Sequence, residues 1–303
     1  MQHIPVLVDP MLEYLAPAKR VIDGTLGAGG HTKALLGAGV DEVLGIDCDP
    51  AALELARTTL APYGGRVHIA HNSYVNMRDE AARLGWGSVD GILLDLGMSS
   101  MQVNTPERGF AFMHDGSLDM RFNPQSNQRT AAEIVNTYPA DELADLFYKY
   151  GEERNSRRIA RHIVEGRPYT TTRQLAAVIE RLVPRHKRDK IHPATRVFQA
   201  LRIAVNDELD AVESVLPTAI DLLRPGGKLA VVSFHSLEDR IVKQIFKHHA
   251  MDCVCPPEAP VCVCDHHASV RLVTRKPIVA DADEIDRNPR SRSAKLRIVE
   301  KLS

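Results

Sequence analysis

The stretch Val21-Ile22-Asp23-Gly24-Thr25-Leu26-Gly27-Ala28-Gly29-Gly30-His31 joins a short apolar run, an acidic residue and a glycine-rich turn. Its four glycines allow the backbone to bend sharply and to approach a ligand closely, where a Cβ atom would intrude. The runs 43–47 and 89–95 are also apolar and end in an acid. A single glycine-rich turn is common between a strand and a helix. Three apolar runs that each end in an acid, at this spacing, predict a doubly wound sheet that binds a nucleotide-like cofactor.

Strand and helix patterns alternate from residue 20 to residue 97, which predicts parallel strands with right-handed crossovers. The predicted strands are 20–24, 42–47, 66–71 and 89–95, and the predicted helices between them are 32–36, 50–60 and 75–84. Because the glycine-rich turn opens onto the first helix, the N–H groups and dipole there suit an anionic cofactor group.

After Gly97 the pattern is helical for about a hundred residues, which predicts an inserted domain. Its predicted helices are 130–136, 140–149, 153–165 and 172–183, followed by one long helix over 194–223. The last part of the chain predicts a fifth strand at 228–234, a helix that Ser236 starts with capping-box spacing, and an edge hairpin of 270–275 and 294–300. The expected domains are a discontinuous core of 1–105 and 206–303 and a helical insert of 106–205.

Composition indicates a globular protein. The chain has 303 residues, of which 44% are hydrophobic and 25% charged, so it can bury a full core. No apolar run reaches the length of a membrane span, and Met1-Gln2-His3-Ile4-Pro5 lacks the layout of a signal peptide, so we expect a cytoplasmic protein. Five cysteines at this size do not indicate a disulfide scaffold.

Two classes of cofactor fit a glycine-rich first turn: nicotinamide or flavin dinucleotides, and S-adenosylmethionine. The fingerprint from Asp23 to Gly30 does not register as G-x-G-x-x-G, the spacing that serves a pyrophosphate. It does place an acid directly before the turn, where the ammonium group of S-adenosylmethionine could be met. Asp47 ends the second predicted strand, where it is placed to bond ribose hydroxyls, although Asp47-Cys48-Asp49-Pro50 is also rich in turn formers. These details favour S-adenosylmethionine.

Five blocks of sequence, in order, closely resemble the bacterial small-subunit rRNA cytosine-N4 methyltransferases, the MraW or RsmH family. They are Asp-Gly-Thr-Leu-Gly-Ala-Gly-Gly-His (23–31), Leu-Leu-Asp-Leu-Gly-Met-Ser-Ser-Met-Gln (93–102), Glu-Arg-Gly-Phe-Ala-Phe (107–112), His-Pro-Ala-Thr-Arg-Val-Phe-Gln-Ala-Leu-Arg-Ile (192–203) and Ser-Phe-His-Ser-Leu-Glu-Asp-Arg (233–240). The resemblance spans residues 3–300. It implies a class I S-adenosylmethionine-dependent methyltransferase, with a Rossmann-like, mostly parallel sheet and an inserted helical domain.

The resemblance also implies a reaction and a binding site. A methyl group from S-adenosylmethionine is transferred to the exocyclic N4 amine of one cytidine in the decoding region of 16S rRNA. The implied cofactor contacts are Gly29, Gly30, His31, Asp47, Tyr74, Asp95 and Gln102. From the residues alone, His31 could face solvent and Tyr74 could belong to the core. Tyr74 follows the third strand, however, at the end of the sheet where such folds bind ligands.

Positive charge is concentrated in the insert. From Gly151 to Arg202 there are 13 Lys and Arg against 5 Asp and Glu, a net charge of +8 in a chain whose net charge is −1. A charge run is commonly a solvated helix face, but the compact segment 185–190 suits contacts with RNA phosphates. The residues expected to make these contacts are Arg185, Lys187, Arg188 and Lys190.

Asp95 is the expected catalytic residue. The exocyclic nitrogen of cytosine is a poor nucleophile, and an acceptor just after the fourth strand could hold its N–H groups. Amino-methyltransferases generally have Asp or Asn followed by Pro-Pro and an aromatic here, whereas this chain has Asp95-Leu96-Gly97-Met98-Ser99. No stacking partner for the base is therefore identified. Attack through C5 is less favoured because it needs a cysteine nucleophile at the ring, and Cys48 adjoins the ribose acid.

Two features near the end of the chain have more than one interpretation. Cys253-x-Cys255 and Cys262-x-Cys264, followed by His266 and His267, resemble a metal cluster, but zinc knuckles more often have two-residue gaps. We expect a reduced hairpin without metal. His235, at the end of the fifth strand, either contacts substrate or anchors a turn.

Two other functions remain open at this level: a non-catalytic rRNA-binding assembly factor, and a dinucleotide-dependent oxidoreductase. The expected partner is 16S rRNA, within the small ribosomal subunit, and no membrane is expected. The sequence decides neither whether free rRNA suffices as substrate nor whether the protein is a monomer or a homodimer.

Overall fold

The computed structural model describes residues 5–126, 128–183, 192–256 and 261–303. The chain divides into two compact units: unit 1 is Met1–Gly97 with Leu209–Ser303, and unit 2 is Met98–Glu208. The sequence predicts a helical insert of 106–205, so unit 2 begins eight residues earlier and ends three residues later than predicted. Helix α5 (Ser100–Asn104) belongs to unit 2 because it contacts the short helix η3 (Pro106–Arg108).

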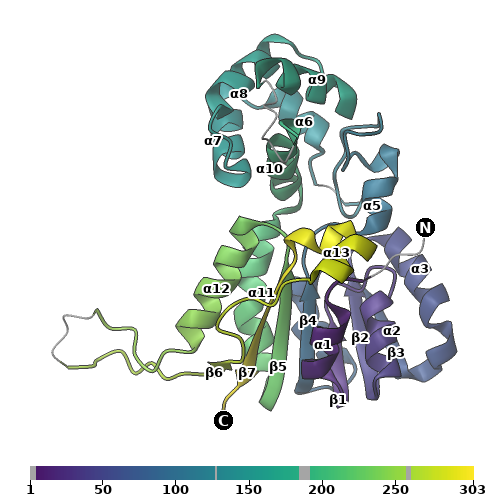
Figure 1. Ribbon diagram of the computed structural model, residues 1–303, viewed down its shortest axis with the longest axis vertical. Helices are drawn as coiled ribbons and strands as arrows, with labels where there is room; N and C mark the ends of the chain where they lie inside the picture. Colours follow the sequence, from purple (N-terminus) through teal and green to yellow (C-terminus); the bar gives the residue numbers. More distant parts are fainter. Residues whose placement is uncertain (1–4, 127, 184–191, 257–260) are drawn as a thin grey trace. The chain divides into compact units, whose positions relative to one another are not determined.

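Unit 1 is built on a seven-stranded sheet with the order β3-β2-β1-β4-β5-β7-β6 (Figure 1). Its strands are β1 (Ala18–Asp23), β2 (Val40–Asp47), β3 (Val67–His71), β4 (Val89–Asp95), β5 (Leu223–Ser233), β6 (Val270–Leu272) and β7 (Lys295–Lys301). The first five strands pair in parallel, and β7 runs antiparallel to both β5 and β6. The predicted class, a mostly parallel Rossmann-like sheet, is confirmed.

The predicted edge hairpin is wrong in one respect. β6 and β7 do pair, but β7 lies inside the sheet between β5 and β6. The four residues 296–299 are all buried, as in an interior strand that is covered on both faces. Buried and exposed residues therefore do not alternate along β7 as they would in an edge strand. Only β6 is an edge strand at that side, and α13 (Ala282–Arg287) lies in the long connection between the two strands.

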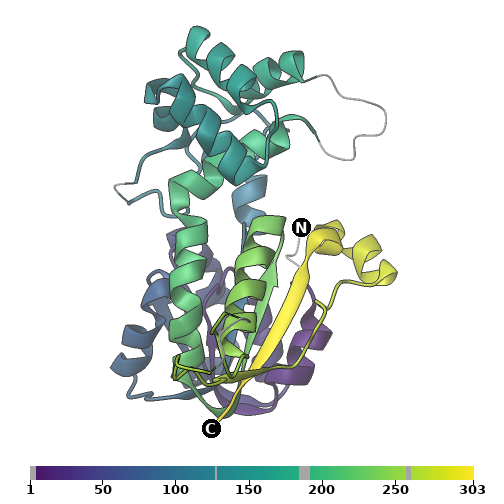
Figure 2. The same cartoon turned by 90° about the vertical axis from the view of Figure 1, so that its left-hand side faces the viewer.

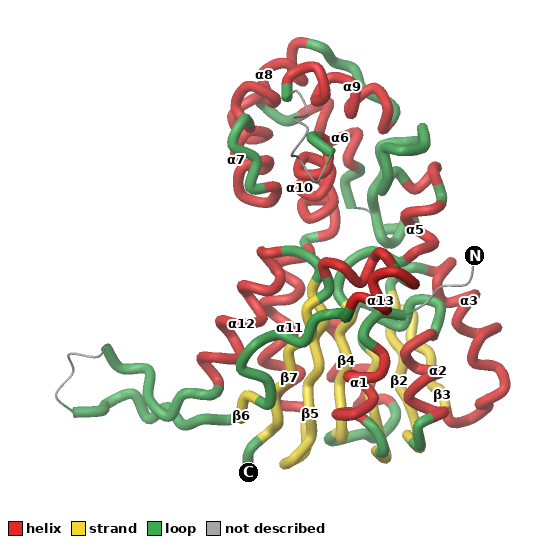
Figure 3. Tube along the Cα trace, viewed as in Figure 1, coloured by secondary structure: helices red, strands yellow, loops and turns green. Residues whose placement is uncertain are grey.

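Helices cover both faces of the sheet, as Figures 2 and 3 show. One face packs on α4 (Met77–Arg83), α11 (Glu208–Leu222) and α12 (Ser236–His249), and the other on α1 (Val8–Leu15), α2 (Gly30–Gly37) and α3 (Pro50–Leu60). The consecutive residues Val21 and Ile22 of β1 are both 0% exposed and belong to opposite faces. Each contributes about 1.5–3 kcal/mol by leaving water, so β1 takes part in the apolar core on each face of the sheet.

Unit 2 has its own helical core. Besides α5, its helices are α6 (Ala131–Thr137), α7 (Ala140–Gly151), α8 (Ser156–Glu165), α9 (Thr172–Leu182) and α10 (Ala194–Asn206). Phe147 on α7 is fully buried where α7 packs on α8 and α10. Among the described residues of the chain, no helix has both the length and the apolar character that a bilayer crossing requires.

The single long helix predicted over 194–223 is wrong. It is two helices, α10 and α11, because Asp207 between them has a left-handed conformation with φ 51°. Aspartate tolerates this conformation better than most residues with a Cβ atom, and the Asp207 N–H still closes α10 by donating to the carbonyl of Ile203. The sequence pattern carries no glycine or proline at this point that would have marked the break.

Candidate active site

The glycine-rich turn after β1 is held by a buried carboxylate. Asp23 is 0% exposed, and its two oxygens accept hydrogen bonds from the Thr25 N–H (3.2 Å) and the Thr32 hydroxyl (2.7 Å). Burial raises the pKa of Asp23, against the opposing effects of His31 and Thr32. Asp23 therefore fixes the turn to the first residues of α2, and the ammonium contact that its position in the sequence allows stays a prediction.

Two glycines of this turn have backbone conformations that side chains disfavour. Gly27 has φ +53° and Gly29 has φ +82°. A Cβ atom on Gly29 would also lie 2.9 Å from Leu60 Cδ1. The turn thus requires glycine at Gly29 for conformation and for space, and the helix α2 that follows begins at Gly30 with its first N–H groups at the C-terminal end of the sheet.

Asp47 at the end of β2 faces the same turn. Its Oδ2 accepts the Gly27 N–H at 2.8 Å, and its Oδ1 accepts the Asp49 N–H at 2.8 Å. Burial raises the pKa of Asp47 to about 6 and outweighs these two bonds, which lower it. Each carboxylate oxygen keeps a second lone pair, so Asp47 can accept hydroxyl groups from a ligand while it holds the turn.

His31 and Asp95 lie next to each other between α2 and β4. His31 Nε2 donates to the Val6 carbonyl at 2.9 Å, which directs Nδ1 to Asp95 Oδ2 at 3.6 Å. The Asp95 N–H donates to Thr25 Oγ1 at 2.6 Å, so the end of β4 is tied to the glycine-rich turn. Thr25 was not singled out from the sequence, although its place within Asp23-Gly24-Thr25 is the signal that could have identified it.

Asp95 carries a buried acceptor whose hydrogen-bonding capacity is unused. Among the residues that the structure describes, no group donates to Asp95 Oδ1. Burial raises the pKa of Asp95 to about 6; His31 acts in the opposite sense, and Asp23 and Glu238 add to the increase. Buried carboxylate oxygens are almost always paired in folded proteins, so this atom marks a place where a ligand can donate.

Tyr74 follows β3 and begins the short helix η2 (Tyr74–Asn76). Its Cβ lies 3.2 Å from the position that a Cβ atom on Gly24 would take, which places it against the glycine-rich turn. Tyr74 is partly buried and also packs on the core. The structure thus brings six of the predicted cofactor residues together at the C-terminal end of the parallel strands: Gly29, Gly30, His31, Asp47, Tyr74 and Asp95.

The seventh, Gln102, belongs to unit 2. It is buried on α5, and its Oε1 accepts the Ser99 N–H at 2.9 Å while Ser99 Oγ accepts the Gln102 N–H at 3.2 Å. This capping box fixes the start of α5. Gln102 therefore has a clear structural role in its own unit.

His235 is the N-cap of α12. Its Nδ1 accepts the Glu238 N–H at 3.4 Å, and the Glu238 side chain returns to the His235 N–H, which completes a capping box. The prediction that Ser236 caps this helix is therefore wrong by one residue, because histidine is an uncommon cap. The four predicted phosphate-binding residues lie outside the described residues: Arg185, Lys187, Arg188 and Lys190.

Comparisons with known proteins identify the family of the chain. Two curated relatives, from Dehalococcoides mccartyi and Thermomicrobium roseum, are both named ribosomal RNA small subunit methyltransferase H. Each is 51% identical to this chain, and the alignments cover 99% of the chain and 86% and 94% of the relatives. A solved structure from Streptococcus mutans, described as a putative methyltransferase in complex with SAH, overlays with a TM-score of 0.43 at 12% identity, covering 99% of both chains. The sequence matches the MraW methylase family over residues 1–302, and the chain belongs to that family.

Proposed function

We propose that this protein transfers a methyl group from S-adenosylmethionine to the exocyclic N4 amine of one cytidine in 16S rRNA. Family membership excludes the oxidoreductase alternative, and the relatives' name supports a small-subunit rRNA substrate. The observation that carries the chemistry is Asp95 Oδ1, a buried acceptor with no donor among the described residues. A ribosomal substrate supports a cytoplasmic location as part of this proposal.

The residues at the end of the sheet fit the cofactor. The turn from Gly27 to Gly30 leaves no Cβ atoms at its closest points, and Asp47 has free lone pairs for the ribose hydroxyls. Tyr74 lies beside the turn, where its ring can cover the adenine. When bound, S-adenosylmethionine supplies an electrophilic methyl group on a sulfonium centre. The proposal also includes Gln102, a residue of unit 2, as a contact of the cofactor.

Asp95 is proposed to make the amine reactive. In the reaction the nitrogen gains a methyl group and loses one proton. The lone pair of the amine is delocalised into the ring, so an acceptor that binds its N–H favours the pyramidal geometry that attack requires. Because burial raises its pKa to about 6, Asp95 is a better proton acceptor than an exposed aspartate and is still mostly ionised at neutral pH.

Unit 2 is proposed to bind the RNA backbone. On α8, Ile159 and Ile163 face the core, whereas Arg157, Arg158 and Arg161 are exposed. The predicted phosphate-binding residues of segment 185–190 would add to this positive charge. In the same proposal His235, which caps α12, contacts the substrate base.

The test of catalysis is methyl transfer to small ribosomal subunits and to free 16S rRNA, followed by nucleoside mass spectrometry. We expect N4-methylcytidine in wild-type reactions and its loss from the rRNA of a deletion strain. A protein that binds the subunit with unchanged affinity but forms no methylated product would instead be the non-catalytic assembly factor.

The test of RNA binding compares two fourfold alanine variants. The first removes the basic side chains of the segment 185–190: Arg185, Lys187, Arg188 and Lys190. The control removes four exposed arginines of unit 1: Arg57, Arg78, Arg83 and Arg271. With roughly 0.7 units of logarithmic slope per single-strand phosphate contact, the first variant should reduce the salt dependence by up to about 3 units. Equal slopes for both variants would remove the segment from the interface.

A further inference from the structure

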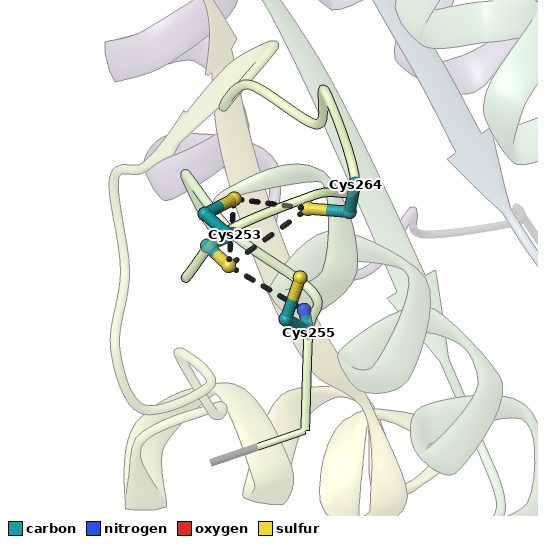
Figure 4. Close-up of side chains that lie close together, drawn as sticks. Cys253, Cys255 and Cys264 are labelled. Carbon is teal, nitrogen blue, oxygen red and sulfur yellow. Dashed lines mark hydrogen bonds between the residues drawn. The ribbon is translucent and has the colours of Figure 1, made fainter. Parts of the chain in front are cut away.

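Cys253, Cys255 and Cys264 lie close together in the segment between α12 and β6 (Figure 4), and Cys262 belongs to the same cluster. Cys253 Sγ lies 3.4 Å from Cys262 Sγ and 3.8 Å from Cys264 Sγ, and Cys262 Sγ lies 3.6 Å from Cys264 Sγ. Together with Cys255, all four sulfur atoms lie within 4.8 Å of one another. Two Cys-x-Cys pairs that are separated in the sequence thus form one compact cluster of sulfur atoms.

The spacing of the sulfur atoms is that of a metal site. A tetrahedral zinc ion with Zn–S bonds of about 2.3 Å holds its sulfur atoms about 3.8 Å apart, close to the three distances observed. A disulfide requires about 2.05 Å, and all four cysteines are free thiols. The geometry therefore matches a set of four ligands around a common centre better than it matches two crosslinks.

Backbone N–H groups point at the sulfur atoms. The Val254 N–H donates to Cys264 Sγ at 3.4 Å, and the Val263 N–H donates to Cys255 Sγ at 3.5 Å, so each arm of the segment donates to a sulfur of the other. The Cys255 N–H also donates to Cys253 Sγ at 3.4 Å. Such bonds stabilise thiolates and orient them as ligands, which is the usual environment of a structural metal site.

Among the residues of this segment that the structure describes, none belongs to an apolar core that would explain why the two arms meet. Three valines beside the cysteines are exposed: Val254 is 36% exposed, Val261 69% and Val263 81%. The nearest anchor is His266, whose Nε2 donates to the His248 carbonyl at the end of α12 at 3.1 Å. A short segment without a core needs a crosslink or a metal ion to hold a defined structure.

We propose that Cys253, Cys255, Cys262 and Cys264 bind one zinc ion as four thiolates, in place of the metal-free hairpin expected from the one-residue gaps. Zinc is chosen over other ions because an all-sulfur, four-coordinate set suits it and the site has no open position for catalysis. Binding releases the thiol protons, so the site carries a net charge of −2. Its role is structural, and it is independent of the methyl-transfer reaction.

The experiment measures metal content in the full chain, purified without a metal-affinity tag and under reducing conditions. Elemental mass spectrometry should give one zinc ion per chain. Replacement by Co(II) should give the absorption bands of a tetrahedral cobalt thiolate. Cys253→Ser and Cys262→Ser should each weaken zinc binding at least a hundredfold in a chelator competition, whereas Cys48→Ser, at the fifth cysteine, should leave it unchanged.

Thiol reactivity tests the wild-type chain without any substitution. A thiol reagent should modify Cys48 alone before a strong chelator is added and all five cysteines afterwards, with the far-ultraviolet circular dichroism of the sheet and helices preserved. The proposal is overturned if all four cysteines react without chelator, if mass spectrometry finds two disulfides in the reduced preparation, or if the bound ion is iron.

Discussion

Replacing Asp95 by asparagine should stabilise the free protein while it slows the reaction. The folded-state pKa of Asp95 is raised from 3.8 to about 6, so the folded chain binds this proton more tightly than the unfolded chain. The stability that Asp95 contributes is therefore fully present below about pH 4 and is lost as the pH rises through about 6. One pKa unit corresponds to about 1.4 kcal/mol, so the loss approaches about 3 kcal/mol at pH 8.

Asparagine keeps the shape of the side chain but has no charge to bury. Because the Asp95 side chain retains 18% exposure, we expect Asp95→Asn to raise the free energy of unfolding by about 1–3 kcal/mol at pH 8. Little change is expected at pH 4, where the wild-type carboxyl is neutral. Denaturant titrations followed by the fluorescence of Trp86, the single tryptophan and a buried residue of unit 1, measure this difference.

Asp90→Asn is the matched control on the same strand. Burial acts to raise the pKa of Asp90, but hydrogen bonds from the Arg20 N–H and the Arg224 guanidinium outweigh it and lower the pKa. This variant should therefore lose stability at pH 8 relative to acid pH, the opposite of Asp95→Asn. An Asp95→Asn chain that is equally or less stable at pH 8 would refute the reasoning about the buried charge.

The same variant separates catalysis from folding. If Asp95 accepts an N–H of the substrate amine, Asp95→Asn should lower kcat by about a hundredfold or more, with little change in rRNA affinity. Single-turnover methylation at saturating cofactor measures this rate. A near-wild-type rate in a stabilised variant would mean that the amine is activated by another group.

Three further substitutions test the site and its supports. Asp47→Ala should weaken S-adenosylmethionine binding by at least about a hundredfold, since two charge-assisted hydrogen bonds contribute about 1.5–3 kcal/mol each; calorimetry on the folded variant measures it, and unchanged affinity would remove Asp47 from the site. Gly29→Ala should lower the free energy of unfolding by about 1–2 kcal/mol because alanine disfavours the left-handed backbone, and the close contact of its Cβ atom with Leu60 should add to this loss; an unchanged stability would contradict the requirement for glycine in the turn. His235→Ala should cost about 1 kcal/mol as a lost N-cap, whereas His235→Asn should restore it.

Much of the fold was readable from local patterns. The apolar runs that end in Asp23, Asp47 and Asp95 predicted three parallel strands, because burial on both faces leaves near-continuous apolar sequence. The glycine-rich turn predicted the ligand-binding edge of the sheet because glycines let the backbone bend sharply and approach a ligand closely. Family resemblance, and not periodicity, supplied Tyr74 and Gln102.

The features that the sequence did not predict are those that depend on long-range contacts or on a single dihedral angle. The position of β7 depends on pairing with a strand far away in the sequence, which no local alternation encodes. The break at Asp207 is one residue in a left-handed conformation within a helical pattern. The convergence of the four sulfur atoms could not be predicted from the sequence, because linear spacing does not show that two separated arms meet.

The discontinuity of unit 1 has a consequence for the order in which the chain folds during synthesis. β4 pairs with β5, yet all of unit 2 is translated between them. Until α11 and α12 emerge, the sheet face that carries Ile22 and Leu94 has only α4 to cover it. The core of unit 2 uses residues of unit 2 only, from Phe110 to Val205. A nascent chain halted after unit 2 would thus carry a finished helical domain and an open, chaperone-accessible half-sheet.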